Sequence, residues 1–160
     1  MQTKEFKILV YEFDTIYELP EQDQEIVLAA RKAAEKAYAP YSEFRVGAAL
    51  RLANEEILSG NNQENSTFTV GLCAERVALF YANANFPEVK VKSLAISAKN
   101  DKGYISNPVS PCGACRQVLH ETELRFKKPI RIILDSKSKI QVFDGVKNLL
   151  PFAFKPELLD

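Results

Sequence analysis

The sequence predicts an α/β fold in which helices cover the faces of a mixed β-sheet. Strand-like alternation and helix-like periodicity succeed one another in the order β-α-β-β-α-β-α-β-β-α, which favours a sheet sandwiched by helices. The chain has 160 residues, 46% of them hydrophobic, which suits one domain with a substantial core. We therefore expect an N-terminal extension, residues 1–20, that adds a strand to a single domain, residues 21–160.

The N-terminal part is predicted to form a strand and then a helix. Apolar residues at every second position from Phe6 to Val10 predict a strand over residues 3–13. A helix begins at Glu21, with acidic residues early, lysines late and an alanine-rich apolar stripe. Pro40 ends it, because proline has no N–H to continue the helix.

A hairpin is predicted over residues 41–61. Its strands are 46–52 and 56–59, joined by a turn at 53–55. The next stretch, 61–71, is polar and bounded by glycine, which indicates a loop. A loop of this length within a compact domain is usually functional or disordered.

A second helix begins at Cys73 and ends at Phe86, and a buried strand follows over 91–98. Residues 100–108 are predicted to be a loop, and a third helix begins at Cys112 and runs to about Glu123. Strands are then predicted at 130–134 and 140–143, and a short helix at 146–150, in front of Pro151.

All three cysteines lie in two short segments, Cys73-Ala74-Glu75-Arg76 and Pro111-Cys112-Gly113-Ala114-Cys115. Three thiolates can hold a zinc ion and leave one tetrahedral position open, which is typical of catalytic zinc. Both segments are predicted at helix N-termini, where the partial positive charge favours thiolate over thiol. We expect one zinc ion per chain, bridging the two helix starts.

Two charged residues next to the cysteines have expected roles at this site. Glu75 is the candidate proton carrier, which takes a proton from the attacking water and hands it to the substrate. Three thiolates and Zn²⁺ sum to a charge of −1, so a nearby cation would assist the chemistry. Arg76 or Arg116 could donate to the sulfurs, and we favour Arg76.

Less specific interpretations remain open for these residues. The cysteines could be ordinary core thiols, or His120 could complete a structural zinc site with four ligands. Glu75 could be a surface ion-pair partner at a helix start. Neither interpretation of the cysteines gives Glu75 a role.

The order Cys-Ala-Glu followed by Pro-Cys-x-x-Cys resembles the small zinc-dependent cytidine deaminases in their three-cysteine form. The resemblance covers about residues 24–154. Its supporting blocks are 39–49 (APYSEFRVGAA), 62–65 (NQEN) and 150–154 (LPFAF). Phe68 departs from the pattern, because many relatives have tyrosine there.

The resemblance implies a three-layer cytidine deaminase-like fold and a set of roles. Zinc is bound by Cys73, Cys112 and Cys115, and Glu75 shuttles protons. The substrate would be contacted by Asn62 and Glu64 at the ribose 3′-hydroxyl, Phe44 at the pyrimidine ring, the Ala74 N–H at the 2-carbonyl, and Phe154 at the base in a neighbouring subunit. The family forms homotetramers with shared active sites, so we expect one here.

The expected activity is hydrolytic deamination of cytidine and deoxycytidine to uridine and deoxyuridine, with release of ammonia, in pyrimidine salvage. A deaminase of blasticidin-like cytosine nucleosides is the nearest alternative, and the pair Asn62 and Glu64 favours a free ribose. A non-catalytic zinc module is the alternative from another class.

Charge and composition limit the partners. Lys+Arg and Asp+Glu are both 21, so the formal net charge is zero, which argues against nucleic acid or a membrane surface as a partner. The first residues lack the apolar core of a signal peptide, and three cysteines do not suggest a disulfide framework. We expect a cytoplasmic enzyme with a small-molecule nucleoside substrate.

Overall fold

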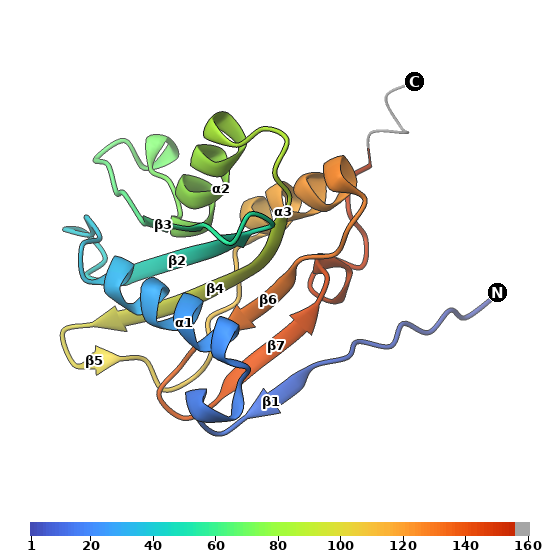
Figure 1. The fold of residues 1–160 in the computed structure, drawn as a ribbon, viewed down its shortest axis with the longest axis horizontal. Coiled ribbons are helices and arrows are strands. Elements are labelled where there is room, and N and C mark those ends of the chain that lie inside the picture. Colours follow the sequence, from blue (N-terminus) through green and yellow to red (C-terminus); the bar gives the residue numbers. More distant parts are fainter. Residues whose placement is uncertain (156–160) are drawn as a thin grey trace.

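A computed structural model describes residues 1–155, so the last five residues of the predicted domain lie outside the described part. It contains one seven-stranded sheet with the strand order β1-β7-β6-β4-β2-β3, and β5 pairs with β4 (Figure 1). The strands are β1 (Tyr11–Phe13), β2 (Arg45–Leu52), β3 (Ile57–Asn61), β4 (Val91–Asn100), β5 (Gly103–Tyr104), β6 (Arg131–Leu134) and β7 (Ile140–Asp144). The α-helices are α1 (Glu21–Ala34), α2 (Ala74–Asn85) and α3 (Gly113–Phe126), and short 3₁₀ turns occur at Ile16–Glu18, Phe68–Val70 and Val146–Asn148.

The sheet is mixed, as the sequence predicts. Strands β4 and β6 run parallel, and every other pair among the described strands is antiparallel. Helix α1 covers one face, and α2 and α3 cover the other (Figure 1). The predicted architecture of a mixed sheet between helical layers is confirmed.

Alternation along the strands divides the core in two. On β2, Ala48 and Leu50 face α2 and α3, whereas Ala49 between them faces α1. On β6, Ile132 and Ile133 divide in the same way. Successive side chains of a strand point to opposite faces, so a single run of apolar residues fills both layers.

Buried ion pairs fasten α1 to β6 and to the residue that follows it. The Arg31 guanidinium donates to both carboxylate oxygens of Asp135, at 2.8 and 2.7 Å, and the Ser97 hydroxyl donates to the same group at 2.7 Å. Asp135 is 1% exposed, so these three bonds satisfy a fully buried carboxylate. At the start of α1, the Asp23 carboxylate accepts from Arg131 Nε at 2.8 Å. The helix is therefore held at both ends.

Four predicted boundaries are wrong. The expected strand over residues 3–13 is a strand only at Tyr11–Phe13; the register with β7, which ends at Asp144, leaves residues 3–8 with no strand opposite them. The first helix is predicted to end at Pro40, but α1 ends at Ala34. Beyond Ala34 the helical turn is tighter, because the Lys36 and Ala37 N–H groups bond to carbonyls three residues earlier.

The third boundary lies in the predicted loop 100–108, which contains β5. Strand β4 continues to Asn100 and turns back through Gly103, whose φ is 104°. The predicted helix at 146–150 is only the 3₁₀ turn Val146–Asn148. None of the helices within residues 1–155 is long and apolar enough to cross a membrane.

Replacing Gly47 by alanine tests how closely α1 packs on β2. An added Cβ would lie 2.0 Å from the Ala30 carbonyl oxygen and 2.4 Å from the Ala34 nitrogen. Both atoms are backbone, so the helix itself must move. We expect Gly47→Ala to lower the free energy of unfolding, measured by urea denaturation, by about 1–3 kcal/mol or more. This range is the usual cost of overpacking.

Gly113→Ala is the matched control, since an added Cβ at Gly113 meets no described atom within 4 Å. An equal loss of stability in both variants would contradict the close approach of α1 to β2.

Candidate metal centre

The structure brings the three cysteine sulfurs together at the N-termini of α2 and α3. Cys73 is the residue before α2, Cys112 is the residue before α3, and Cys115 lies in the first turn of α3. The Cys73 and Cys112 sulfurs are 3.7 Å apart, the Cys112 and Cys115 sulfurs 3.4 Å apart, and all three lie within 4.8 Å of one another. The two sequence segments therefore form one cluster.

This cluster fits a zinc ion. Four ligands placed tetrahedrally at the usual zinc–sulfur distance of about 2.3 Å are separated from one another by about 3.8 Å. The observed separations are close to that value, and all three cysteines are free thiols rather than disulfides. Within residues 1–155, this is the one group of three or more potential ligands that could hold a metal ion. His120 is outside it, which argues against a structural site with four protein ligands.

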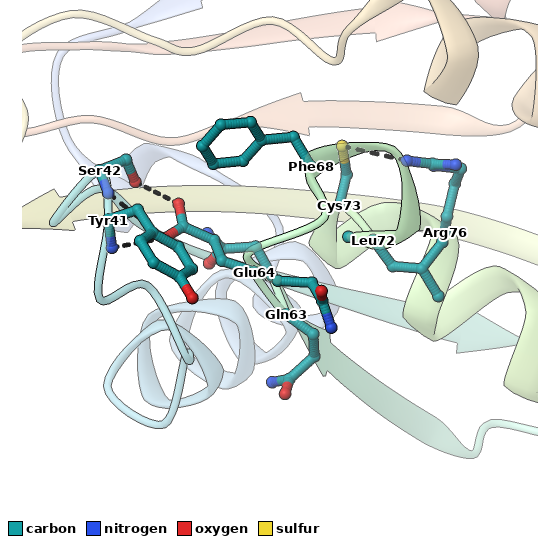
Figure 2. A pocket seen from close by; sticks show the side chains of 11 residues that line it. Tyr41, Ser42, Gln63, Glu64, Phe68, Leu72, Cys73 and Arg76 are labelled. Atoms are coloured by element: carbon teal, nitrogen blue, oxygen red, sulfur yellow. Dashed lines mark hydrogen bonds between the residues drawn. The ribbon is translucent and has the colours of Figure 1, made fainter.

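Arg76 and Arg116 make different contacts. Arg76 Nη2 lies 3.7 Å from the Cys73 sulfur (Figure 2). Arg116 instead donates to two backbone carbonyls, that of Pro111 at 2.7 Å and that of Leu149 at 2.8 Å. Arg76 can offset negative charge on the sulfurs, whereas Arg116 fixes the approach to α3 and the chain after β7.

Hydrogen bonds between the sulfurs shift the pKa values of Cys73 and Cys115 in opposite directions. A hydrogen bond from the Cys115 thiol, helped by those from Arg76 and Cys112, lowers the pKa of Cys73 to about 5. The pKa of Cys115 is raised, because Cys115 is the donor in that bond and is also buried. The cluster thus holds a thiolate at neutral pH, which is the form of cysteine that binds zinc.

Glu75 is buried beside the sulfurs. It is the second residue of α2, its side chain is 4% exposed, and burial raises the pKa of its carboxyl above the ordinary value. Glu75 lines an inner cavity of about 170 Å³ together with Cys73, Cys112 and Asn62. A carboxyl group that titrates at higher pH, and that faces the same cavity as the sulfurs, is suited to accept and return a proton.

A larger cavity of about 540 Å³ opens next to the inner one (Figure 2). Asn62 and Cys73 line both, so a molecule in the outer cavity can reach the sulfurs. Its lining is Tyr41, Ser42, Asn62, Gln63, Glu64, Asn65, Phe68, Gly71, Leu72, Cys73 and Arg76.

Asn62 and Glu64 hold the backbone of residues 41–46 against this cavity. The Asn62 side chain accepts from the Val46 N–H at 2.8 Å and donates to the Phe44 carbonyl at 3.0 Å. The Glu64 carboxylate accepts from the N–H groups of Tyr41 and Ser42, at 2.9 and 3.3 Å, and from the Ser42 hydroxyl. Both side chains are oriented by protein contacts while still lining the cavity.

Two predicted site residues are not among the residues that line the two cavities in the single chain. The Phe44 side chain is half-buried and is not part of either lining. Phe154 is 56% exposed, and its carbonyl accepts from the Gln117 side chain at 3.0 Å. Ala74 lines the inner cavity.

Sequence reasoning gave no role to Tyr41, Ser42 or Leu72, which line the outer cavity. Tyr41 and Ser42 stand three and two residues before Phe44 in a block that the resemblance singled out, and this was the available signal. Leu72 gave no signal in the sequence, since one leucine in a polar loop is unremarkable. The Tyr41 and Phe68 rings contact edge to face, with centroids 6.0 Å apart, and form one wall.

Comparisons with known proteins agree with this geometry. Residues 20–128 match the model of the cytidine and deoxycytidylate deaminase zinc-binding region. The chain is 44% identical to a cytidine deaminase of Sporosarcina psychrophila over 84% of this chain and 92% of that protein. It is 32% identical to a cytidine deaminase of Mycoplasma genitalium over 81% of this chain and 93% of that protein. A crystal structure of cytidine deaminase from Burkholderia pseudomallei superposes with a TM-score of 0.66 at 36% identity, covering 81% of this chain and 97% of that one.

Zinc binding can be tested by ranking variants. We expect the purified protein to carry about one zinc ion per chain. Arg76→Gln should weaken zinc binding by about 10–100-fold, the usual cost of losing a group that contacts a metal ligand. Cys112→Ser should weaken it further, because a ligand itself is lost.

Competition with a chromogenic chelator measures these affinities, and Arg125→Gln, at the far end of α3, is the matched control. Zinc affinity unchanged by Cys112→Ser would contradict the three-sulfur site.

Proposed function

The chain belongs to the cytidine and deoxycytidylate deaminase family, and we propose that it is a zinc-dependent hydrolase that converts cytidine and deoxycytidine to uridine and deoxyuridine, releasing ammonia. One observation supports this most strongly: the Glu75 carboxyl and the Cys73 and Cys112 sulfurs face one cavity. A structural zinc site needs neither the cavity nor the acid. When bound by Cys73, Cys112 and Cys115, zinc supplies Lewis-acid activation of the water that the reaction consumes.

Glu75 acts as the general base and general acid in this proposal. The attacking water loses a proton, and the amino group that leaves as ammonia must gain one. A single carboxyl between these two points can accept the first proton of the water and deliver it to the ring nitrogen N3. It can then take the second proton from the hydroxyl added at C4 and pass it to the leaving nitrogen, which departs as ammonia. The raised pKa of the buried Glu75 carboxyl suits a group that must hold a proton during turnover.

The remaining groups orient the nucleoside. Asn62 lines both cavities and Glu64 lines the outer one. We assign them to the ribose 3′-hydroxyl, because an amide and a carboxylate can pair with a hydroxyl as donor and acceptor. The Ala74 N–H is among the first of α2, which have no partner within the helix, and we assign it to the 2-carbonyl oxygen. We assign Phe44 to packing against the pyrimidine ring.

We place Phe154 at the base in a neighbouring subunit of a homotetramer. Phe152 and Phe154 are largely exposed in the single chain, as are Phe80 and Tyr81 on α2. Exposed aromatic side chains of this kind are enriched at subunit interfaces. We also propose that the enzyme acts in the cytoplasm, in pyrimidine salvage.

Glu75→Gln separates an enzyme from a zinc-binding module. The amide keeps the size of the side chain but cannot accept and return a proton. We expect kcat for cytidine to fall by at least about 10²-fold, the lower range for lost acid–base catalysis, while zinc content stays near one per chain. Loss of absorbance as cytidine becomes uridine gives the rate, and metal analysis gives the zinc.

Glu88→Gln, an exposed glutamate after α2, is the control and should retain wild-type turnover. Wild-type turnover by Glu75→Gln would refute the assigned role of Glu75, and a wild-type protein with no turnover of either nucleoside would refute the proposed function.

The shared site predicts complementation between two differently impaired chains. We expect Phe154→Ala to raise KM for cytidine about tenfold, since base–aromatic stacking is worth this much. Glu75→Gln and Phe154→Ala chains, mixed and reassembled, should give some sites with an intact Glu75 facing an intact Phe154. KM measured on the mixture should include a wild-type component, and a mixture that behaves as the sum of its parts would contradict sharing.

A further inference from the structure

We propose that Ser42 is a positioning residue for the reaction: its hydroxyl holds the Glu64 carboxylate in the orientation that receives the ribose 3′-hydroxyl. This rests on the proposed function, in which Glu64 contacts the ribose. Ser42 lines the outer cavity beside Glu64, and their side chains point toward each other (Figure 2).

The hydrogen-bond pattern fixes which way the Ser42 hydroxyl points. Its oxygen accepts from the Phe44 N–H at 3.1 Å, and a carboxylate oxygen can only accept. The hydroxyl hydrogen is therefore directed to Glu64 Oε1. The other oxygen, Oε2, is held separately by the N–H groups of Tyr41 and Ser42.

The two carboxylate oxygens thus have different partners. Backbone groups hold Oε2, and they remain whatever the side chain at position 42. Oε1 is held by the Ser42 hydroxyl and retains acceptor capacity, because each carboxylate oxygen has two lone pairs. Oε1 is therefore the oxygen that we assign to the ribose hydroxyl, and Ser42 sets its position.

Ser42 also links the two groups that we place around the nucleoside. Through the Phe44 N–H it is joined to the residue whose carbonyl accepts from Asn62 at 3.0 Å. The hydrogen bond from Ser42 is also the main cause that lowers the pKa of Glu64, which favours the charged acceptor. One hydroxyl therefore stabilises both the geometry and the charge of the ribose acceptor.

The experiment compares Ser42→Ala with wild type on two substrates, cytidine and 3′-deoxycytidine. The second lacks the hydroxyl that Glu64 would bind. We expect Ser42→Ala to lower kcat/KM for cytidine about tenfold, chiefly through KM, the scale of one hydrogen bond to a charged group. For 3′-deoxycytidine the change should stay within about twofold.

Three further variants sharpen the test. Ser42→Thr keeps the hydroxyl and should restore most of the activity on cytidine, so it also serves if Ser42→Ala fails to fold, which thermal unfolding detects. Adding Ser42→Ala to Glu64→Ala should cause no further loss, because the two act through one contact. Ser59→Ala, an exposed serine on β3 outside the cavity, should match wild type.

The outcomes separate this inference from the function on which it rests. An equal loss on both nucleosides in Ser42→Ala would show that Ser42 supports the loop in general, and would overturn its assignment as a positioning residue for Glu64. No loss on either nucleoside would overturn it too. Wild-type enzyme that processed both nucleosides equally would overturn the ribose role of Glu64 and this inference together, while leaving cytidine deamination itself intact.

Discussion

Three sulfurs from two helices can share one ion only if both helices begin at the same point above the sheet. Gly60 on β3 sets the position of α2, because an added Cβ there would lie 2.7 Å from both the Ala74 carbonyl oxygen and the Ala78 nitrogen. The N-terminal turn of α2 therefore lies closer to the sheet than any other residue at position 60 would allow. Strands β4 and β6 are parallel, so the chain must cross over the sheet between them, and α3 is the helix in that crossover. The metal centre depends on these two placements.

The two faces of the sheet differ in what covers them. The face under α1 is closed by apolar packing and by the buried ion pairs Arg31–Asp135 and Asp23–Arg131. The opposite face carries the starts of α2 and α3. The outer cavity is also lined by Asn62, which follows β3, and by Tyr41 and Ser42, which precede β2. Because side chains alternate along each strand, residues that rigidify one face do so without occupying the other. Each face is thus packed by its own set of residues, and the site lies at the helix starts on the face that α2 and α3 cover.

Much of this arrangement could be predicted from the sequence, and the rest has identifiable reasons for being missed. Cys-x-x-Cys and Cys-Ala-Glu are each local patterns, so the candidate ligands and the acid beside Cys73 could be identified from the sequence. That the two segments, 39 residues apart, share one ion was a hypothesis supported by the family resemblance. Strand alternation gave the sheet, but it also extended the first strand back to residue 3, because a period of two does not reveal whether a partner strand exists. The sequence analysis favoured Arg76 over Arg116, but the different contacts of the two side chains are visible only in the structure. The contact between Ser42 and Glu64 joins residues 22 positions apart, which no local pattern encodes.

The charge balance of the site explains how Glu75 can be buried there. Three thiolates exceed the charge of one Zn²⁺ by one, and an ionised Glu75 adds a second negative charge in a place where it is 4% exposed. Arg76, 3.7 Å from the Cys73 sulfur, offsets one of these charges. The N-termini of α2 and α3 each supply about half a positive charge, and neither Cys73 nor Cys112 caps its helix through a side-chain hydrogen bond. Taken together, these charges nearly cancel, so a single proton can move onto and off Glu75 without leaving a large uncompensated charge in the protein interior.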